Sequence, residues 1–445
     1  MSSPTGTVHA LLGQASFRWY LLMVVASLVA FELQTVAVGW QLFEATGDAL
    51  SLGLTGLAGA IPFLSTALVA GHVADAHDRR RVCLGALAVL IACSATLATL
   101  TWTGLALRQH WTIYAVIVAA GFARSFLFPA RGALLAELVP RPWMETAVRL
   151  RSTVFQLGAV MARSASGFVY AYGASLGLGA GFSYALAGLL LGVAGTALLS
   201  MRLAPRAPTA HPEPVLTSLA GGVRYVAGSP ILLGAMLLDL LGVLFGDAIV
   251  LLPVFVNQIW HGGPQSLGLL RAAPAAGAVV MAFILMRRPP LRHAGPTLLV
   301  AVGGFGLAMI GFAVSPWLPL AAACLALSGA LDFISVTIRG SLLQILTPPH
   351  LLGRVTSVQQ MFIWSSNEIG AFESGVAARV LGLVPSVVAG GAVTVGVTVV
   401  TAWRNRSLRG LGRITPEAKP VAAAPPLPRH APNARPQAIA EAGTA

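Results

Sequence analysis

The sequence predicts an all-α polytopic membrane protein with twelve transmembrane helices in two pseudo-symmetric bundles of six. The chain is 56% hydrophobic and 10% charged, whereas soluble domains are nearer a quarter charged. Its apolar runs reach the length of about 20 residues that crosses about 30 Å of hydrocarbon. Two segments of the first half also return, diverged, in the second half. The length would allow two or three soluble domains, but the apolar runs are too long for ordinary core helices.

The internal repeat is visible in two pairs of segments. RGALLAELVP at 131–140 returns as RGSLLQILTP at 339–348, and SLGL at 51–54 returns at 266–269. Chance similarity of apolar sequence is the alternative, but an Arg-Gly and a Pro at fixed spacing argue against it. Related halves in a membrane protein usually enclose a transport path at their interface.

The expected spans are helices, because a closed barrel would show short alternating segments. They lie at 17–42, 50–70, 82–103, 111–130, 150–172, 177–200, 230–258, 265–286, 294–314, 317–346, 355–381 and 384–403. No cleavable signal peptide is expected, because the first apolar run is too long. The three cysteines lie within spans without metal spacing, so neither a disulfide framework nor a metal site is expected.

The predicted domain organisation has five parts. They are an N-terminal cytoplasmic segment (1–14), a first six-helix bundle (15–200), a linker (201–229), a second six-helix bundle (230–404) and a cytoplasmic tail (405–445). Prolines in the linker precede a short amphipathic helix expected from Val215 to Val226. The tail is rich in Ala, Pro and Arg, and we expect it to be disordered.

The net charge of +13 comes from arginines in alternate loops. Clusters at 79–81, 202–224 and 287–292 alternate with loops that are nearly free of them. This pattern is the positive-inside rule, so we expect a multi-pass protein of the inner (plasma) membrane with both termini in the cytoplasm. The arginines do not gather on a soluble face, so nucleic acid is not an expected partner.

The loop after the second span reads Gly71-His72-Val73-Ala74-Asp75-Ala76-His77-Asp78-Arg79-Arg80-Arg81. Topology signalling would need only the arginines, and the G-x-x-x-D-x-x-x-R-R spacing is more specific. This segment resembles the signature loop of the major facilitator superfamily (MFS), and the resemblance covers about residues 15–405. Further stretches resemble the branch of enterobactin exporters and multidrug efflux pumps, the twelve-helix drug:proton antiporters; they lie at 128–140, 239–255, 267–278, 329–348, 353–359 and 366–375.

The resemblance implies alternating access by rocking of two bundles, usually export driven by inward proton flow, without a cofactor and as a functional monomer. It also implies a cytoplasmic gate in which Asp75 faces the start of helix eleven. We assign this gate to Gly71, Asp75, Arg79, Arg80, Arg81, Arg131, Arg339 and Arg354. Relatives often have a Gly-Pro pair in helix five where this chain has Arg163-Ser164, a departure in the region that antiporters use to limit leak.

Ionisable groups at membrane depth cost several kcal/mol and are functional candidates. The carboxylates assigned to proton coupling and the transport path are Glu32, Asp239, Asp247, Asp332 and Glu368. A static ion pair or a helix–helix hydrogen bond is the alternative for Asp239 and Asp332. Snorkelling into the cavity without a role is the alternative for Glu32. Glu44 and Asp48, in a loop, are expected to be solvated.

The substrate cavity is assigned to Arg124, Arg163, Phe31 and Trp364. Arg163 suits an anionic or catecholate group through cation–π or forked hydrogen bonds, and pairing with a nearby acid is the equal alternative. Arg124 is opposite Asp332 in the repeat, and one hypothesis is attraction between them across the interface when the inner side is closed. Pairing of each charge within its own half is the competing possibility.

The predicted function is secondary export of a moderately large, partly aromatic or amphipathic small molecule, siderophore-like or drug-like. The expected mechanism is proton antiport, and sodium stays open as the coupling ion. An uptake symporter of the same fold is the alternative. A membrane enzyme is disfavoured because H-E-x-x-H and G-x-S-x-G are absent from the sequence. The symmetric twelve-span layout argues against a sensor that does not transport.

Overall fold

The computed structural model describes residues 4–203, 215–287, 293–348 and 351–412. The long helices of the first half are α2 (Ala15–Thr46), α3 (Ala49–Ala76), α4 (Arg79–Trp102), α6 (Trp111–Leu138), α7 (Met144–Ser175) and α8 (Gly179–Leu199). Those of the second half are α10 (Pro230–Gly246), which continues through η2 (Ile249–Leu251) into α11 (Leu252–Gln258), then α12 (Pro264–Arg287), α13 (Ala294–Ala313), α14 (Leu318–Leu346), α15 (Leu352–Leu381) and α16 (Leu383–Arg404). The shorter helices are α1 (Pro4–Gly13), α5 (Leu105–Arg108), η1 (Arg141–Trp143), α9 (Val215–Gly228) and α17 (Arg406–Arg409).

The ends of several long helices follow from local capping chemistry. Gly47 ends α2 in the left-handed conformation (φ 64°), which glycine adopts without steric cost. The next residue, Asp48, caps α3 by accepting the backbone N–H of Leu50 at 3.0 Å. Asp78 caps α4 in the same way by accepting the N–H of Arg80 at 2.9 Å.

Within the described residues, nine helical stretches are long and apolar enough to cross a bilayer. They are α2, α4, α6, α8, α10 with α11, α12, α13, α14 and α16. The three other long helices, α3, α7 and α15, lie where the bundles meet: α3 packs against α15, and α7 packs against α12. Polar side chains such as Arg163 and Glu368 therefore face the interface between the halves, and the twelve long helices agree with the predicted spans.

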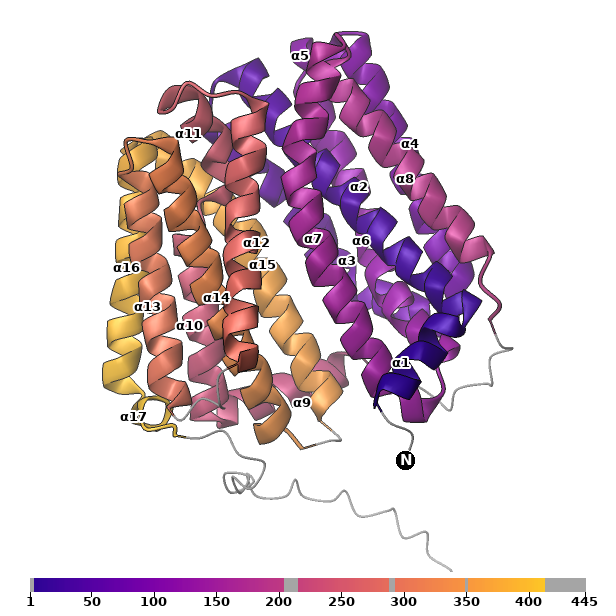
Figure 1. The fold of residues 1–445 in the computed structure, drawn as a ribbon, viewed down its shortest axis with the longest axis vertical. Helices are drawn as coiled ribbons and strands as arrows, with labels where there is room; N and C mark the ends of the chain where they lie inside the picture. Colours follow the sequence, from indigo (N-terminus) through magenta and orange to yellow (C-terminus); the bar gives the residue numbers. More distant parts are fainter. Residues whose placement is uncertain (1–3, 204–214, 288–292, 349–350, 413–445) are drawn as a thin grey trace, which may run out of the picture.

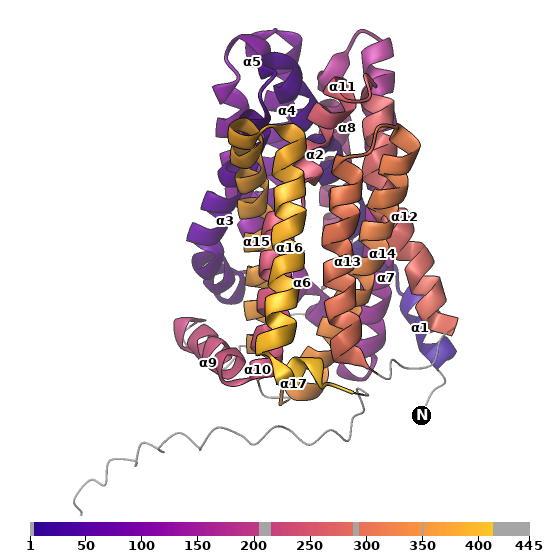
Figure 2. The same ribbon diagram turned by 90° about the vertical axis from the view of Figure 1, so that its left-hand side faces the viewer.

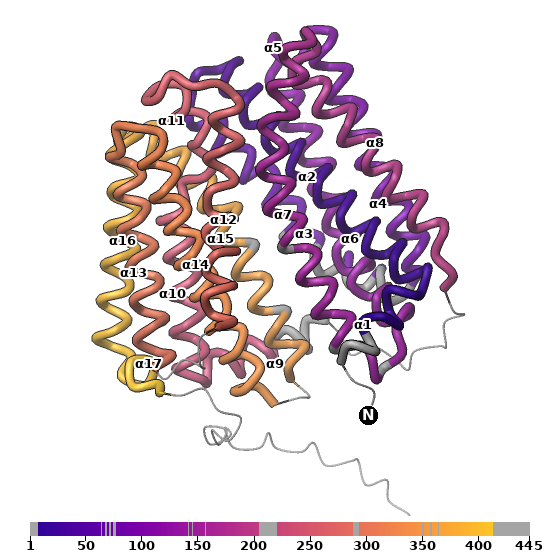
Figure 3. Tube along the Cα trace, viewed as in Figure 1, coloured from indigo at the N-terminus to yellow at the C-terminus, as the bar shows by residue number. Residues whose placement is uncertain are grey.

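The helices form two bundles that lie side by side (Figure 1). The indigo-to-magenta bundle holds α2–α8 and the salmon-to-yellow bundle holds α10–α16, and Figure 2 shows the second bundle from its outer side. α1, α9 and α17 lie at one end of the molecule, here named the arginine-rich end, and α5 and α11 lie at the other, the distal end (Figure 3). Both ends of the described chain are therefore at the arginine-rich end.

Among the described residues, the hydrophobic core that the two bundles share lies toward the distal end. One cluster there joins first-half residues such as Trp40 and Tyr184 to second-half residues such as Phe255 and Phe312. Toward the arginine-rich end each half has a core of its own, around Phe17 in the first half and around Leu298 in the second. The apolar contact that holds the halves together is thus concentrated at the distal end.

Two segments outside the bundles are described. The predicted amphipathic helix is confirmed as α9, which packs on α15. Residues 405–412, which the sequence assigns to the disordered tail, instead form α17 and a packed turn. Leu408 is fully buried there, and Asn405 donates a hydrogen bond to Pro230 O at 2.7 Å. The physical reason is that this stretch has apolar residues to bury; the rest of the tail and linker residues 204–214 lie outside the described residues.

Candidate functional site

A cavity of about 590 Å³ lies between the two bundles. Its walls come from α2, α3, α4, α6 and α7 of the first half and from α10, η2 and α11–α15 of the second. Phe63, Phe128 and Phe305 give it aromatic surface. The charged side chains that line it are Glu32, Arg124, Arg163, Asp247, Arg271, Asp332 and Glu368. The site therefore gathers six of the predicted residues and one, Arg271, that the sequence reasoning missed.

Glu32 and Arg163 form an ion pair within the first half. The Nε of Arg163 on α7 donates to Oε1 of Glu32 on α2 at 3.1 Å. The Arg163 side chain is 45% exposed and that of Glu32 is 15% exposed. The pair accounts for an acid in the middle of an apolar helix, and it leaves the terminal nitrogens of Arg163 accessible from the cavity.

Arg124 is bound by uncharged partners. Its Nη2 donates to Oε1 of Gln34 at 3.2 Å, and its guanidinium lies over the Phe31 ring, 4.5 Å from the centroid. Gln34 is itself fixed by donating to the Ser94 hydroxyl at 2.6 Å. The buried Nε of Arg124 has no hydrogen-bond partner.

Arg124 and Asp332, which one hypothesis pairs when the inner side is closed, do not form an ion pair in this structure. Arg124 binds Gln34 and lies over the Phe31 ring, whereas the cation nearest to Asp332 is Arg339 of its own helix. The competing possibility, pairing within the half, therefore describes Asp332 in this state. The repeat made Arg124 and Asp332 equivalent positions, and equivalence does not require contact.

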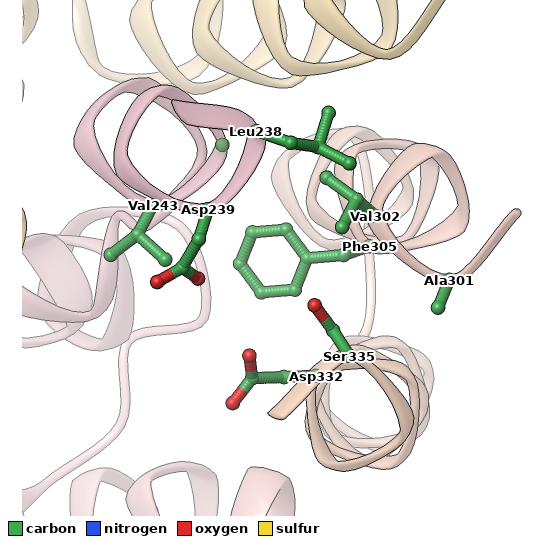
Figure 4. Close-up of a pocket in the computed structure, with 9 residues that line it drawn as sticks. Leu238, Asp239, Val243, Ala301, Val302, Phe305, Asp332 and Ser335 are labelled. Carbon is green, nitrogen blue, oxygen red and sulfur yellow. The ribbon is translucent and has the colours of Figure 1, made fainter. Parts of the chain in front are cut away.

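Asp239, Asp332 and Arg339 form a triad inside the second half. Arg339 on α14 pairs directly with Asp239 on α10, and its Nη2 lies 3.9 Å from Oδ1 of Asp332. The side chains of Arg339 and Asp239 are 5% and 9% exposed, whereas that of Asp332 is 48% exposed. Figure 4 shows Asp239 and Asp332 approaching from two helices beside the Phe305 ring. Arg339, assigned from the sequence to the cytoplasmic gate, pairs with a buried acid in this structure, and its role at the gate stays a prediction.

Asp247 and Arg271 belong to the same region of the cavity wall. Asp247 ends α10 and accepts the backbone N–H of Ile249 at 3.0 Å, so it interrupts the apolar run that predicts one continuous span at 230–258. Arg271 on α12 is half-buried, and its Nε has no hydrogen-bond partner. The sequence does contain a signal for Arg271, because it is a lone arginine inside the apolar span expected at 265–286.

The predicted gate arginines of the first half make their contacts within that half. Arg79 donates to Oε1 of Glu137 at 2.9 Å and to Ala133 O at 3.1 Å, so it joins α4 to α6. Arg80 donates to Leu199 O, and Arg81 lies 3.7 Å from Asp78. The guanidinium of Arg131 lies over the Phe128 ring.

Other predicted residues are only partly accessible to description. Arg354 on α15 lies against Gly221 and Gly222 of α9. For Gly71, Asp75 and Trp364 the structure describes only the helical backbone. The Asp75 latch therefore stays a prediction. Among the residues that are described, no group of three or more His, Cys, Asp or Glu is arranged to hold a metal ion.

Two acids at the distal end, Glu44 and Asp48, were expected to be solvated but contact other side chains. Asp48 of the first half pairs with Arg379 on α15 of the second half at 3.0 Å. Glu44 accepts from Trp40 Nε1 at 2.5 Å and from the Tyr170 hydroxyl at 3.2 Å. Both acids are therefore structural partners, and the first of them links the halves.

Two six-helix bundles around a charged central cavity define a transporter of the major facilitator superfamily. The chain belongs to its transmembrane secretion effector family, whose model matches residues 6–415. This finding confirms the resemblance carried by the loop at 71–81 and the later stretches. It also makes the chain a multi-pass membrane transporter of the exporter branch and not an enzyme.

Relatives and solved structures agree with this assignment. Enterobactin exporter EntS of Citrobacter koseri is 30% identical over 358 residues, which cover 80% of this chain and 83% of that protein. EntS of Escherichia coli O1:K1 is 28% identical over the same length. A bacterial homologue of the human lysosomal transporter Spinster, inward-facing and unoccupied, has a TM-score of 0.68 at 15% identity and covers 89% of this chain and 99% of its own. A D-xylose-proton symporter has a TM-score of 0.66 at 12% identity, with 88% and 98% covered. The solved structures show the fold alone.

Proposed function

We propose that the protein exports a partly aromatic, siderophore-like or drug-like small molecule from the cytoplasm by alternating access, coupled to proton entry. The observation that carries the proposal is the central cavity, because both halves build it and it combines aromatic surface with charged side chains. Relatives named enterobactin exporter cover four-fifths of this chain, which favours a siderophore-like substrate.

Alternating access is supported by the uneven contact between the halves. Their shared apolar core, the crossings of α3 with α15 and α7 with α12, and the Asp48–Arg379 pair lie toward the distal end. Toward the arginine-rich end the two halves have separate cores, so the halves can move apart there. By the positive-inside rule the arginine-rich end and both termini face the cytoplasm. We therefore propose that the protein, in this arrangement, receives its substrate from the cytoplasm.

Proton coupling is proposed for the carboxylates of the cavity. An ionised carboxylate is costly at membrane depth, which makes exchange of a proton a natural use for it. Asp332 and Glu368 line the cavity and can exchange protons with its water, whereas Asp239 is buried against Arg339. Protonation of Asp332 would remove its negative charge, and Asp239 would then be the remaining anionic partner of Arg339 in the triad. No resident cofactor is needed for this scheme, and we expect the monomer to be sufficient.

The test is flux in everted membrane vesicles and proteoliposomes. With the interior made acidic, everted vesicles should accumulate a catecholate or a cationic dye, and a protonophore should abolish accumulation. Vesicles that contain Arg287→Gln serve as the control, because Arg287 lies exposed at the arginine-rich end of α12. Accumulation that ignores the pH gradient would overturn the coupling, and substrate movement in the same direction as the proton would favour the uptake symporter instead.

A further inference from the structure

Arg163 and Arg271 line the cavity from opposite halves. Gly167 on α7 lies directly against Gly268 on α12, where a Cβ on Gly268 would be 2.8 Å from Gly167 Cα. Arg163 is four residues before Gly167, and Arg271 is three residues after Gly268, so each arginine shares the helix face of its glycine. At 1.5 Å per residue, they lie about 6 Å and about 4.5 Å from the crossing toward the arginine-rich end. The crossing therefore places two arginines, one from each half, at similar depths.

The two guanidiniums have more donors than the protein satisfies. A guanidinium carries five N–H donors. The hydrogen bond between Arg163 and Glu32 uses the Nε of Arg163. Arg271 makes no side-chain hydrogen bond or ion pair within the described residues, and its Nε is buried without a partner. A half-buried cation without direct partners is costly unless a ligand or water supplies acceptors.

Two acids, Glu32 and Asp247, line the same cavity as the two arginines. Glu32 is already engaged by Arg163, and Asp247 accepts the backbone N–H of Ile249. The four groups balance in formal charge. Within the described residues, Arg271 is the member of the cluster whose side chain makes no direct hydrogen bond or ion pair, and its Nε is buried.

We propose that Arg163 and Arg271 form a binding site for an oxyanion of the transported molecule, such as a carboxylate or a deprotonated catechol oxygen. Planar guanidinium groups bind such groups through paired, charge-assisted hydrogen bonds. The inference rests on the proposed function, since it assigns the substrate class of the same cavity. It also gives Arg271 a role as a specificity-determining residue that selects anionic substrates.

The placement of the site suggests how the anion is released. One arginine belongs to each half, and the Gly167–Gly268 crossing keeps them together. Opening the distal end must separate α7 from α12, so it moves Arg163 away from Arg271. The anion then keeps one guanidinium instead of two, and its affinity falls in the state that faces outward.

The test measures binding of three catechols that differ in charge. The purified full-length chain is dialysed against labelled 3,4-dihydroxyphenylacetate (anionic), its amide (neutral) and dopamine (cationic). The wild-type chain should bind the anion at least tenfold more tightly than the amide, and dopamine least tightly. Arg271→Gln should remove this preference while it changes the affinity for the amide less than twofold. Arg271→Lys, which keeps the charge but loses the fork, should give an intermediate preference.

Two controls separate a binding role from a structural one. Arg287→Gln makes the same change on the same helix outside the cavity, and it should keep the full preference. The thermal midpoint of Arg271→Gln without ligand should equal or exceed that of the wild type, because the substitution removes an unpaired cation. The double variant Glu32→Gln/Arg163→Gln, which removes the ion pair as a unit, should also reduce the preference for the anion.

Several results would overturn the site. They are equal binding of anion and amide by the wild type, a preference for dopamine, no saturable binding of the anion, or equal loss of all three ligands in Arg271→Gln. These failures are distinguishable from failure of the proposed function. Gradient-driven flux that is indifferent to substrate charge leaves export intact and removes the anion site. Charge-selective binding without flux would leave the anion site intact and remove the proposed export function.

Discussion

Gly53 and Gly268 occupy the same position in the two helix crossings that join the halves. A Cβ at Gly53 would lie 2.9 Å from Gly375 Cα, and a Cβ at Gly268 would lie 2.8 Å from Gly167 Cα. Each crossing brings two backbones into direct contact, which only glycine permits. The SLGL repeat in the sequence therefore corresponds to a repeated contact, once between α3 and α15 and once between α12 and α7.

Gly268→Ala should destabilise the protein and disturb the crossing of α7 and α12. The added methyl group meets backbone, which cannot rotate away, and overpacking of this kind costs about 1–3 kcal/mol. The thermal midpoint of the purified protein and the rate of gradient-driven flux should both fall.

The matched control is Gly192→Ala on α8, where a Cβ would meet nothing within 4 Å. Alanine is the better helix former, by up to about 1 kcal/mol, so this variant should be neutral or slightly stabilised. If both variants have the same midpoint, the close approach at Gly268 does not limit stability.

Arg339→Gln should be among the most destabilising single changes in the second half. It leaves the carboxylate of Asp239 buried without its cation, and breaking a buried pair in this way costs about 3–5 kcal/mol. The double variant Asp239→Asn/Arg339→Gln should recover much of the loss, because no isolated charge remains. Unfolding in detergent, followed by circular dichroism, measures the three variants. A double variant less stable than Arg339→Gln would show that the pair is not the source of the effect.

Asp332→Asn should separate stability from coupling. Asp332 is half-exposed and 3.9 Å from Arg339, so its neutralisation should change the thermal midpoint little. If Asp332 carries the proton, substrate exchange without a gradient should persist while gradient-driven accumulation is lost. Accumulation equal to that of the wild type would remove Asp332 from the coupling path. The comparison with Glu368→Gln, made in the same vesicles, indicates which cavity acid carries the proton.

The sequence predicts the helices well where length and apolar composition determine them. The spans expected at 265–286 and 294–314 are α12 and α13 within one residue at each end. The break after α10 was missed, because hydropathy reports apolar character and not continuity of the backbone. Gly246 followed by Asp247 was the available signal, since both residue types favour helix ends.

The partners of the buried charges could not be predicted from the sequence. Asp48 and Glu44 looked solvated because they follow a span, yet tertiary packing brings Arg379 and Tyr170 to them. Arg339 looked like a gate residue because Arg131 is its counterpart in the repeat. The pairing with Asp239 depends on how α10 packs beside α14, which is not encoded in either segment alone.

Arg124 and Asp332 are equivalent positions in the repeat, yet their contacts predict that a charge swap between them should not restore transport. The two residues have different environments: Arg124 donates to Gln34 and lies over the Phe31 ring, whereas Asp332 is beside Arg339. Arg124→Asp/Asp332→Arg should therefore transport no better than Arg124→Asp alone, because an arginine at position 332 would lie beside Arg339. Arg124→Glu/Glu368→Arg should recover part of the flux, because Glu368 lines the same cavity from the other half and has no ion-pair partner within the described residues. Rescue by the first swap, and not by the second, would contradict this assignment.

The Asp48–Arg379 pair should stabilise closure of the distal end only weakly. The two side chains are 37% and 59% exposed, and exposed pairs contribute about 0–1 kcal/mol and are screened by salt. A double-mutant cycle with Asp48→Asn and Arg379→Gln, followed by thermal midpoints, should give a small positive coupling that shrinks in high salt. Arg287→Gln, combined with Asp48→Asn in place of Arg379→Gln, should give no coupling. A coupling that is unchanged by salt would mean that the pair is shielded from solvent, and closure of the distal end would then depend on this contact more than on the shared apolar core.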